Sequence, residues 1–413
     1  MSNSLLTVDE ALDQILGRIT PLGLARSSLL EAAGSVLAEA VASPIDWPRF
    51  DASAMDGYAV LHHDLTPLLT NQPVTLQVVG FVPAGQHVET PLRAGQAYKI
   101  MTGAPLPPGA DTVVMREDTD EGEGQVRVRV APKDGRGANI RRQGENLRQG
   151  TLLYPTGVLV DPGLIGLLAS FGRSQVAIHR APRVAILSTG DELAEIDARD
   201  LAPSQIINSS SYMLAAQVSR AGGVPIVLPL VPDVRESITA ALKDAIACAD
   251  LVLTIGGVSM GDLDLVRAAI EELSDQVGFW QVAIKPGKPL AFGSVGGIPL
   301  IGLPGNPVSS FVTFEIFVRP ALQKLLGSHQ LRLPRVMARS TKALEAPRNR
   351  TLYVRGKVFA DAEGLVFDAD LSQSSANLLS VVDIDGLGVV GPGQQLNAGD
   401  WVHVDLLRSP RVR

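Results

Sequence analysis

The chain has 413 residues, and its 36 Lys and Arg against 43 Asp and Glu give a net charge of −7. This mildly acidic balance argues against a protein built mainly to hold DNA or RNA, because such proteins favour a basic surface. Hydrophobic residues make up 46% of the chain and charged residues 19%, which is the opposite of the balance that keeps a chain disordered.

The sequence also bears on the cellular compartment. Cys248 is the single cysteine, which excludes an internal disulfide and any zinc site built from several cysteines. The N-terminal sequence MSNSLLTVDEALDQ has no basic segment and no apolar core, so it predicts no secretory signal peptide. The long uncharged stretch at 289–314 is rich in Pro and Gly, which favours turns and short strands over a membrane-spanning helix. We therefore expect a cytoplasmic protein that binds no membrane.

The first forty residues predict two helices. Thr7 and Glu10 form a capping box before apolar residues at helical spacing. Ser28 and Glu31 repeat this pair before a second helix that is expected to end near Ala42.

A segment with a different hydrophobic period follows. From about 74 to 131, VTLQVVGFV, GQAYKIM, ADTVVMRE and QVRVRVA alternate in polarity and predict strands. A strand, a helix and a strand then return before residue 180, and Asp161-Pro162 is typical of the start of that helix. We therefore predict a β-rich domain at 46–147, inserted into a discontinuous N-terminal domain of 1–45 plus 148–180.

From 182 to 326 apolar strands alternate with amphipathic helices. This pattern predicts a doubly wound parallel sheet with helices on both faces. Asp233 and Glu236 are expected to cap one helix, and PVSSFVTFEIFVRPALQKLL to form the last, long one. Ligands bind such sheets at the carboxyl ends of the strands, so the loops after RVAILST, DLVLTI and IPLIGL are the candidate site. The fold class is multidomain α/β, with an α/β domain at 181–328 and a C-terminal small β domain at 329–413.

The loop after DLVLTI carries glycines and carboxylates. Gly256 and Gly257 let the backbone approach a ligand closely, and Asp262 and Asp264 open a helix whose N-terminal amides suit phosphate. Carboxylates there would repel phosphate unless a divalent cation lay between them, and Mg²⁺ accepts one or two carboxylates together with ligand oxygens. On spacing alone, helix capping explains both Asp residues equally well.

The loop after RVAILST contains Asp191 and Glu192 in the sequence LSTGDEL. An ordinary acidic helix start is one explanation of this pair. Because both acidic loops lie at the same edge of the predicted sheet, the other explanation is a shared site for an anion and a metal ion.

Two further loops have features of an anion site. Lys285 and Lys288 flank a Pro-Gly turn in IKPGKPLAFG, and two lysines on a rigid turn suit phosphate or a tetrahedral oxyanion. In GLPGNPVSS, Pro304 and Pro307 fix the backbone at the end of a strand. Solvated lysines and a purely structural turn are the alternatives for these two loops.

Seven motifs of the chain follow one another in an order known from one family. They are SAMDGYAV, IMTGAPLPPGADTVV, RRQGEN, LSTGDEL, GGVSMGDLD, KPGKPLAFG and GLPGNPVSS. Over nearly its whole length the chain thus resembles the molybdopterin molybdenumtransferase (MoeA) family, to which the gephyrin E domain is related. The resemblance implies the last step of molybdenum cofactor synthesis, in which adenylylated molybdopterin and molybdate are used, AMP is released and Mg²⁺ is needed. It also implies a homodimer with a shared cleft, and molybdopterin adenylyltransferase as the upstream partner.

The resemblance assigns roles to particular residues. Asp56 in MDGYA and Thr102 in MTGAP match catalytic groups that line the cleft from the β-rich domain. Glu192 and Asp264 match acidic positions that act in catalysis and at the metal ion, and Lys285 matches a catalytic anion holder. The residues expected to bind substrate are Gly256, Gly257, Ser259, Asp233, Lys288, Pro304, Pro307 and Ser375.

Two positions depart from the family pattern. Asn146 stands where an acidic residue often follows Gly-Glu, and an amide cannot replace a carboxylate at a metal ion or as a base. Ser210 and Ser211 stand where Asn and Arg are expected, and a missing Arg would remove one anion contact. A catalytically weakened, gephyrin-like scaffold or molybdopterin-binding protein is therefore the alternative function. A paralogue that inserts tungsten also stays open, whereas the related adenylyltransferases resemble only the α/β domain.

Overall fold

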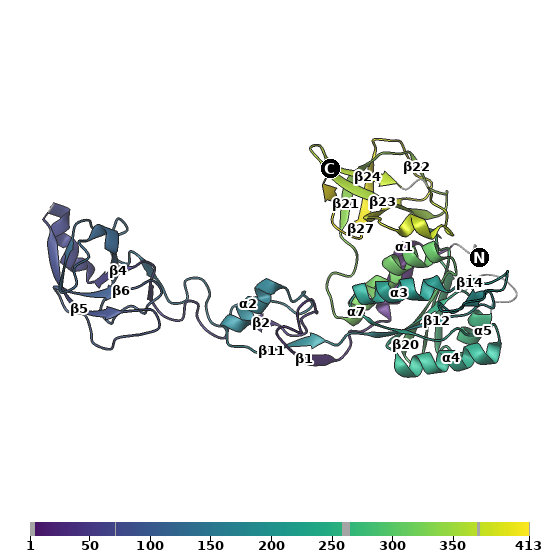
Figure 1. The fold of residues 1–413 in the computed structure, drawn as a ribbon, viewed down its shortest axis with the longest axis horizontal. Coiled ribbons are helices and arrows are strands. Elements are labelled where there is room, and N and C mark those ends of the chain that lie inside the picture. The colour runs from purple at the N-terminus through teal and green to yellow at the C-terminus, as the bar shows by residue number, and fades with distance from the viewer. Residues whose placement is uncertain (1–4, 71, 258–264, 370–371, 413) are drawn as a thin grey trace. The chain divides into compact units, whose positions relative to one another are not determined.

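The computed structural model describes residues 5–70, 72–257, 265–369 and 372–412. The chain divides into two compact units, and Figure 1 labels the elements of both. The large unit comprises 1–39, 156–166 and 174–413, and the small unit comprises 40–155 and 167–173.

A six-stranded sheet, in the order β15-β12-β16-β20-β19-β17, forms the centre of the large unit. The strands span, in that order, Val224–Val227, Arg183–Ser188, Leu251–Ile255, Ile298–Leu303, Pro289–Val295 and Gln276–Gln281. The first four are parallel, as the alternating pattern predicts. β19 pairs antiparallel with both β20 and β17, so the sheet is mixed at this edge.

Short connections explain the antiparallel edge. Gly296 and Gly297 join β19 to β20, and their φ values of 55° and 79° suit a two-residue hairpin. A parallel pair would need a crossover of about a dozen residues, which this stretch lacks. The predicted parallel arrangement therefore holds for the strands whose ends carry the candidate site.

Helices cover both faces of the sheet because successive strand residues point to opposite sides. Val184 and Ile186 of β12 belong to a buried cluster with α1 (Val8–Gly17), α3 (Ser209–Arg220) and α7 (Arg319–Leu325). Ala185 and Leu187 belong to a second cluster, with α4 (Arg235–Cys248) and α5 (Leu265–Leu273). Figure 1 shows the two groups of helices on opposite sides of the sheet, which confirms the doubly wound α/β arrangement.

The predicted long helix after β20 is interrupted by one wider turn. It consists of α6 (Pro307–Thr313), a π-helical turn (Phe314–Val318) and α7. Pro320 lacks the N–H that a regular helix would donate at this point, which accounts for an irregularity in the hydrogen-bond pattern.

A second sheet, in the order β18-β23-β24-β21-β27-β25, completes the large unit, and β28 pairs with β23. These strands span Ile284–Lys285, Thr351–Asp361, Gly364–Ala369, Arg335–Ser340, Trp401–Leu406, Gly386–Val390 and Arg411–Val412. β22 (Leu344–Glu345) pairs with β26 (Gln395–Leu396) beside them. β18 comes from the α/β segment, so its pairing with β23 ties the C-terminal β region to the KPGK turn.

The N-terminal flank contains one of the two predicted helices. Thr7 and Glu10 cap α1 with reciprocal hydrogen bonds, as predicted. The second helix was predicted wrongly: Ser28 and Glu31 do hydrogen-bond to each other, but no helix follows them. Instead β1 (Leu24–Ser28) pairs with β11 (Gln175–His179), and Gly34 has a left-handed φ of 78° that ends any helical run.

The small unit is built on a five-stranded sheet in the order β7-β4-β6-β5-β8. Its strands span Thr112–Met115, Gly57–Val60, Gln96–Ile100, Val74–Val82 and Gln125–Val128, which includes all four predicted strands. Two short pairs lie beside it, β3 with β9 (Ala52–Ser53, Ile140–Arg141) and β2 with β10 (Val41–Ala42, Leu152–Tyr154). Short 3₁₀ helices at His62–Thr70 and Arg116–Asp118 complete the unit, and α2 (Pro162–Ser170) contributes residues to both units.

Within the described residues, no helix is both long and apolar enough to cross a membrane. The four domain boundaries read from the sequence stay a prediction.

Candidate active site

Three strand-end loops of the central sheet meet at one edge. They follow β12, β16 and β20 and contain Gly190, Gly256 and Gly305. The Gly256 N–H donates to the Leu303 carbonyl oxygen at 3.1 Å. A Cβ placed on Gly305 would lie 3.6 Å from Gly256 Cα, and one on Gly256 would lie 3.5 Å from the Thr189 carbonyl oxygen. The predicted meeting of these loops at one sheet edge is therefore confirmed.

The loop after β16 begins with two glycines in left-handed conformation. Gly256 and Gly257 have φ values of 82° and 62°, which residues with a Cβ rarely adopt. Both are half-buried, so their backbone is open to a ligand from one side. Ser259, Asp262 and Asp264 lie outside the described residues, and the roles predicted for them stay predictions.

The acidic residues after β12 organise the neighbouring loop. Asp191 Oδ1 accepts the Asp233 N–H at 3.2 Å. A Cβ on Gly190 would lie 2.5 Å from Glu192 Oε2, so the missing side chain leaves room for this carboxylate beside the turn. Glu192 and Asp233 are both exposed, and neither has a basic partner among the described residues. Both carboxylates are thus available to a ligand.

Asp233 does not cap the following helix, contrary to expectation. α4 begins at Arg235 after Val234, and no side chain caps it. The Asp233 N–H donates to Asp191 instead, two residues before the helix starts. In the described part of the chain, no group of three or more His, Cys, Asp or Glu is placed to hold a metal ion.

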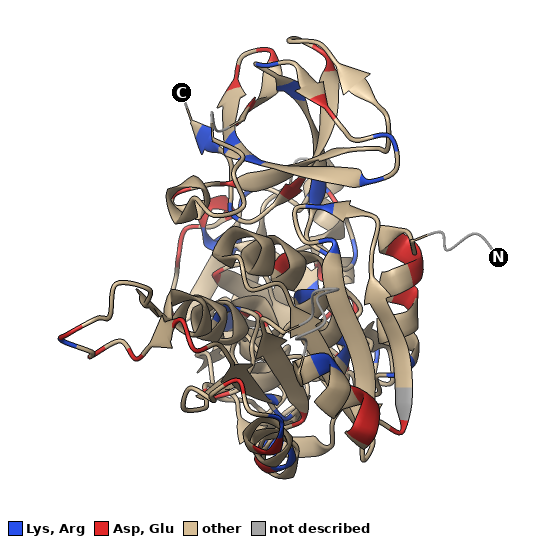
Figure 2. Ribbon diagram, turned by 90° about the vertical axis from the view of Figure 1, so that its right-hand side faces the viewer, with Lys and Arg blue, Asp and Glu red and all other residues tan. Residues whose placement is uncertain are grey.

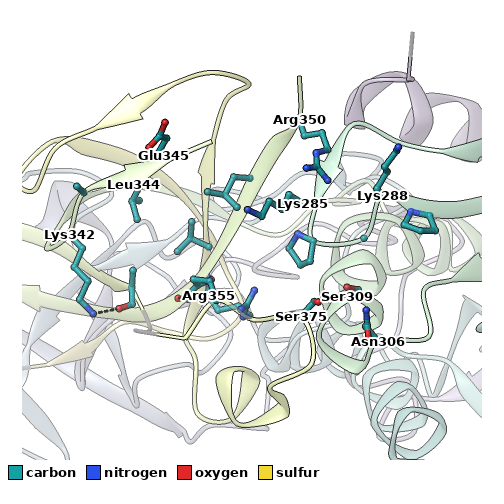
Figure 3. A pocket seen from close by; sticks show the side chains of 18 residues that line it. Lys285, Lys288, Asn306, Ser309, Lys342, Leu344, Glu345, Arg350, Arg355 and Ser375 are labelled. Carbon is teal, nitrogen blue, oxygen red and sulfur yellow. Dashed lines mark hydrogen bonds between the residues drawn. The ribbon is translucent and has the colours of Figure 1, made fainter. Parts of the chain in front are cut away.

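A cavity of about 610 Å³ lies in the large unit beside the KPGK turn (Figure 3). The basic residues that line it are Lys285, Lys288, Lys342, Arg350 and Arg355, and Glu345 is the one acidic residue among its described lining residues. Figure 2 shows both basic and acidic segments where the C-terminal sheet adjoins the rest of the large unit, so the charge of the cavity follows from its lining residues. The cavity therefore has the charge expected of an anion site.

The KPGK turn is fixed from two sides. A Cβ on Gly287, which has a φ of 100°, would lie 2.3 Å from Thr313 Cγ2, so the turn packs tightly against α6. On the other side Lys285 is paired with Leu352, and the Thr351 N–H donates to the Ala283 carbonyl oxygen at 2.9 Å. The backbone of this turn is therefore rigid, as the sequence predicts, and it lies next to the start of β23.

Two arginines of the cavity were not predicted. Arg350 immediately precedes β23 and is half-buried, with no acidic partner among the described residues. Arg355 is 1% exposed; its Nε donates to Ser380 Oγ at 3.1 Å and its Nη2 to the Ser372 and Ser374 carbonyl oxygens at 3.4 Å. A basic residue inside the apolar strand sequence LYVRGKVFA is the signal that could have identified Arg355.

The GNP loop carries polar groups to the same cavity. Asn306 and Ser309 line it, and Pro307 is at the first turn of α6. Ser310 Oγ donates to the Pro304 carbonyl oxygen, which holds the loop onto the helix. Pro304 and Pro307 thus flank a lining residue without lining the cavity themselves.

The C-terminal region adds a hydroxyl to the cavity. Ser375 lines the cavity, and Arg355 holds the loop on which it lies. The substrate-binding role of Ser375 stays a prediction. Its neighbour Ser374 is exposed and is not among the lining residues.

The small unit brings together Asp56 and Thr102. Asp56 Oδ1 accepts both the Thr102 N–H and the Thr102 hydroxyl at 2.8 Å. The backbone N–H, followed by the hydroxyl, holds the pKa of Asp56 below its usual value. Asp56 is therefore an ionised carboxylate at neutral pH, and one of its two oxygens accepts none of the described hydrogen bonds.

The two departures from the family pattern lie in different surroundings. Asn146 is exposed in a turn, where its N–H donates to the Trp47 carbonyl oxygen at 3.1 Å. Ser211 is 0% exposed, and its Oγ lies 2.6 Å from Ser188 Oγ and accepts from Asn208 Nδ2 at 2.9 Å. Ser211 therefore belongs to a buried polar network rather than to the lining of the cavity.

Comparisons with solved structures support the architecture. Two structures of the molybdopterin biosynthesis MoeA protein from Pyrococcus horikoshii match with TM-scores of 0.86 and 0.83, at 30% and 27% sequence identity. Each match covers 98% of this chain and 100% of the other. The arrangement of helices and sheets is therefore that of these proteins.

Sequence comparisons identify the family. Residues 6–172 match the model of the MoeA N-terminal region (domain I and II), 185–324 that of a probable molybdopterin binding domain, and 337–407 that of the MoeA C-terminal region (domain IV). A relative in Nostoc named molybdopterin molybdenumtransferase is 38% identical over 372 residues, 89% of this chain and 84% of its own. One of the same name in Haemophilus influenzae is 37% identical over 379 residues, 91% of this chain and 92% of its own. The chain belongs to the MoeA family.

Proposed function

We propose that this chain inserts molybdenum into molybdopterin, using adenylylated molybdopterin and molybdate and releasing AMP, as the final step of molybdenum cofactor synthesis. The names of its curated relatives support this transferase activity. The single observation that carries the proposal is the cavity, where Lys285, Lys288 and Arg350 have no acidic partners among the described residues. Several unpaired basic side chains around one cavity favour an anionic ligand. Molybdate is the anion that the proposed reaction uses.

Molybdate is a compact tetrahedral dianion and the substrate that these cations would bind. Lys285 and Lys288 provide mobile point charges, whereas the Arg350 guanidinium can donate two parallel hydrogen bonds to one oxyanion. The Ser309 and Ser375 hydroxyls lie on the same cavity and can donate to the remaining oxygens. This donor set orients the oxyanion as well as attracting it.

Mg²⁺ is the proposed cofactor, and Glu192 is the proposed ligand that lies among the described residues. Glu192 offers an exposed carboxylate beside the loops that converge at the sheet edge, and Asp264 is the second proposed ligand. A hard cation of this kind takes one or two carboxylates and completes its shell with water and phosphate oxygens. When bound, it would neutralise and polarise the pyrophosphate linkage of the substrate.

The adenylate end of the substrate is assigned to the strand-end loops. The left-handed Gly256 and Gly257 leave their backbone open to phosphate oxygens, and Asp233 provides an exposed acceptor on the neighbouring loop. Asp56, kept ionised by Thr102, is proposed as the catalytic acidic group that the small unit contributes. A carboxylate with a lowered pKa can hold a positive group or orient a water without itself taking up a proton.

The assembly and cellular setting are further parts of the proposal. A homodimer would let the Asp56 loop of one subunit serve the cavity of the other, which fits functional motifs that fall in separate compact units. Molybdopterin adenylyltransferase is the proposed upstream partner, because its product is the adenylylated substrate. We propose a cytoplasmic location. A chain with one cysteine forms no internal disulfide, which is compatible with a reducing compartment.

The test is AMP release from adenylylated molybdopterin by the purified chain with Mg²⁺, measured with and without molybdate. The proposal expects release that depends on molybdate and a product that activates a molybdoenzyme lacking its cofactor. If nucleotide stays bound and none is released in either condition, the chain is a molybdopterin-binding or scaffold member instead. In that case Asn146, Ser210 and Ser211 are the first positions to revert to the family pattern, and AMP release is measured again.

A further inference from the structure

The helix that follows the GNP loop changes its winding at residues 314–318. α6 and α7 are joined by the π-helical turn Phe314–Val318, in which hydrogen bonds connect residues five apart instead of four. The turn therefore holds one residue more than an α-helical turn, and one residue of a helix corresponds to a rotation of about 100°. When α7 is held in place, the turn decides which face α6 presents to its neighbours.

α7 is held by the core of the large unit. Ala321, Leu322 and Leu325 are buried in the cluster that also contains residues of α1. The Leu22 N–H donates to the Leu325 carbonyl oxygen at 2.8 Å, which ties the end of α7 to the N-terminal segment. Because α7 cannot rotate without breaking this packing, a change of winding in the turn would rotate α6.

One face of α6 supports the oxyanion cavity. Ser309 lines the cavity (Figure 3), and Thr313 lies one helical turn later on the same side. Thr313 Oγ1 donates to the Ser309 carbonyl oxygen at 2.8 Å, and Thr313 Cγ2 is the atom that a Cβ on Gly287 would meet. A rotation of α6 would therefore move Ser309 out of the cavity and remove a support of the KPGK turn.

A buried ion pair lies inside the π-helical turn. The Glu315 side chain is 0% exposed, and Arg319 Nε donates to its Oε2 at 2.5 Å. Gln217 of α3 donates from Nε2 to Glu315 Oε1 at 2.8 Å and to the Phe311 carbonyl oxygen of α6 at 3.3 Å. α3 is itself anchored, because Ser211 on its first turn belongs to the buried network at the end of β12. The carboxylate thus links the turn to both α3 and α7.

This pair is not needed to fill the core. Replacing a buried ion pair with apolar side chains of similar volume is often neutral or stabilising. Apolar side chains cannot supply direction, however, whereas the two hydrogen bonds fix the Glu315 carboxylate between α3 and α7. The specific contribution of the pair is therefore the geometry that it imposes on the turn.

We propose that Glu315 is a positioning residue for the oxyanion cavity. The hydrogen bonds that it accepts from Gln217 and Arg319 hold the π-helical turn, and the turn keeps Ser309 and Thr313 directed at the cavity and the KPGK turn. Glu315 is not among the described residues that line this cavity, so it acts through α6. The inference rests on the proposed function, which makes molybdate the oxyanion, and it adds a residue that sets the affinity from outside the cavity.

The experiment measures molybdate binding to the full chain by equilibrium dialysis, which gives the dissociation constant and the number of sites per chain separately. The main variant combines Glu315→Met with Arg319→Met, which removes the pair without changing the net charge. We expect the dissociation constant to rise about 10-fold, as for the loss of one hydrogen bond to a charged group, with the number of sites unchanged. A purely structural role would instead lower the number of sites and leave the dissociation constant as in the parent.

Glu315→Gln is the conservative variant. Gln217 Oε1 has no hydrogen-bond partner within the described part of the chain. The Gln217 amide can therefore turn over and accept from the new amide, whose own oxygen still accepts from Arg319. Because both links are kept, we expect a dissociation constant within about 2-fold of the parent.

Two further variants complete the test. Gln217→Leu removes the link to α3 while keeping the ion pair, and we expect it to raise the dissociation constant about 5-fold, which keeps the proposal testable should the double variant fail to fold. Ile238→Ala is the control for lost stability, because Ile238 is 0% exposed in the cluster on the other face of the sheet. Its dissociation constant should equal that of the parent.

The outcomes separate the two proposals. A dissociation constant like the parent's in the double variant or in Gln217→Leu would overturn the role of Glu315. An equal rise in Ile238→Ala or in Glu315→Gln would also overturn it, because neither variant removes the two links. Absence of molybdate binding by the parent would instead contradict the proposed function.

Discussion

Arg350 shows that the local sequence does not indicate which of several neighbouring residues lines the cavity. The stretch PRNRTLYVRG contains Arg348, Arg350 and Arg355 within a few positions. Arg350 lines the cavity and Arg355 holds the loop of Ser375, whereas Arg348 is exposed and is not a lining residue. The pairing of Lys285 with Leu352 decides this difference, because it places the residue just before β23 beside the lysines.

A substitution at Arg350 tests the anion site. Arg350→Ala is expected to weaken molybdate binding by about 10- to 100-fold, since a charge-assisted hydrogen bond contributes about 1.5–3 kcal/mol. Equilibrium dialysis or calorimetry at fixed ionic strength measures the change. Arg350→Lys should recover only part of the affinity, because an ammonium lacks the planar fork of the guanidinium.

Arg348→Ala is the matched control, because it removes the same charge from an exposed position two residues away. Its affinity for molybdate should stay within about 2-fold of the parent, as expected for a surface charge. If both variants lose affinity equally, the cavity attracts molybdate only through its general charge and Arg350 has no specific contact.

At the scale of elements, the pairing of β4 with β7 depends on one glycine of the MDGYA motif. A Cβ on Gly57 would lie 1.9 Å from the Val114 carbonyl oxygen, which is backbone and cannot move away easily. The family motif and the strand pairing therefore require glycine at the same position. This arrangement fixes Asp56 next to Thr102, because the strand begins directly after the carboxylate.

Gly57→Ala is expected to destabilise the small unit by about 3 kcal/mol or more, because the backbone clash forces β4 and β7 apart. Differential scanning calorimetry of the full chain measures the effect. Gly124→Ala provides the control in the same unit, since a Cβ there would meet nothing within 4 Å. A Gly57→Ala chain as stable as this control would contradict the close packing of the two strands.

At the scale of the whole molecule, the chain has separate cores in its two compact units. Leu76 lies in the core of the small unit and Leu253 in that of the large unit, at 2% and 0% exposure. Separate cores allow the two units to unfold in separate steps, so a single two-state unfolding free energy does not describe this chain.

Two core substitutions test this organisation. Leu76→Ala and Leu253→Ala should each cost about 2–5 kcal/mol by leaving a cavity. In a calorimetric scan each is expected to lower one transition and leave the other in place. A single transition that both substitutions lower by the same amount would show that the two units unfold as one.

Much of the architecture could be predicted because its signals are local. The period of apolar residues identified four of the five strands in the sheet of the small unit, and the alternation of strands and helices identified the doubly wound sheet. The capping pair of Thr7 and Glu10 marked α1 correctly. The same kind of pair at Ser28 and Glu31 misled, because pairing of β1 with the distant β11 overrides a local preference for helix.

For the candidate site, the sequence by itself determined which loops are candidates for the chemistry, since Gly turns, acidic residues and the lysines of KPGK stand at the ends of recognisable strands. Only the tertiary structure decided which of these groups share a space. It joined the KPGK turn to Arg350, Arg355 and Ser375 through the β18–β23 pair, and it placed Ser211 in a buried network. The physical reason is that hydrophobic period and turn preference act over a few residues. A cavity, by contrast, is made by packing and strand pairing between segments that are far apart along the chain.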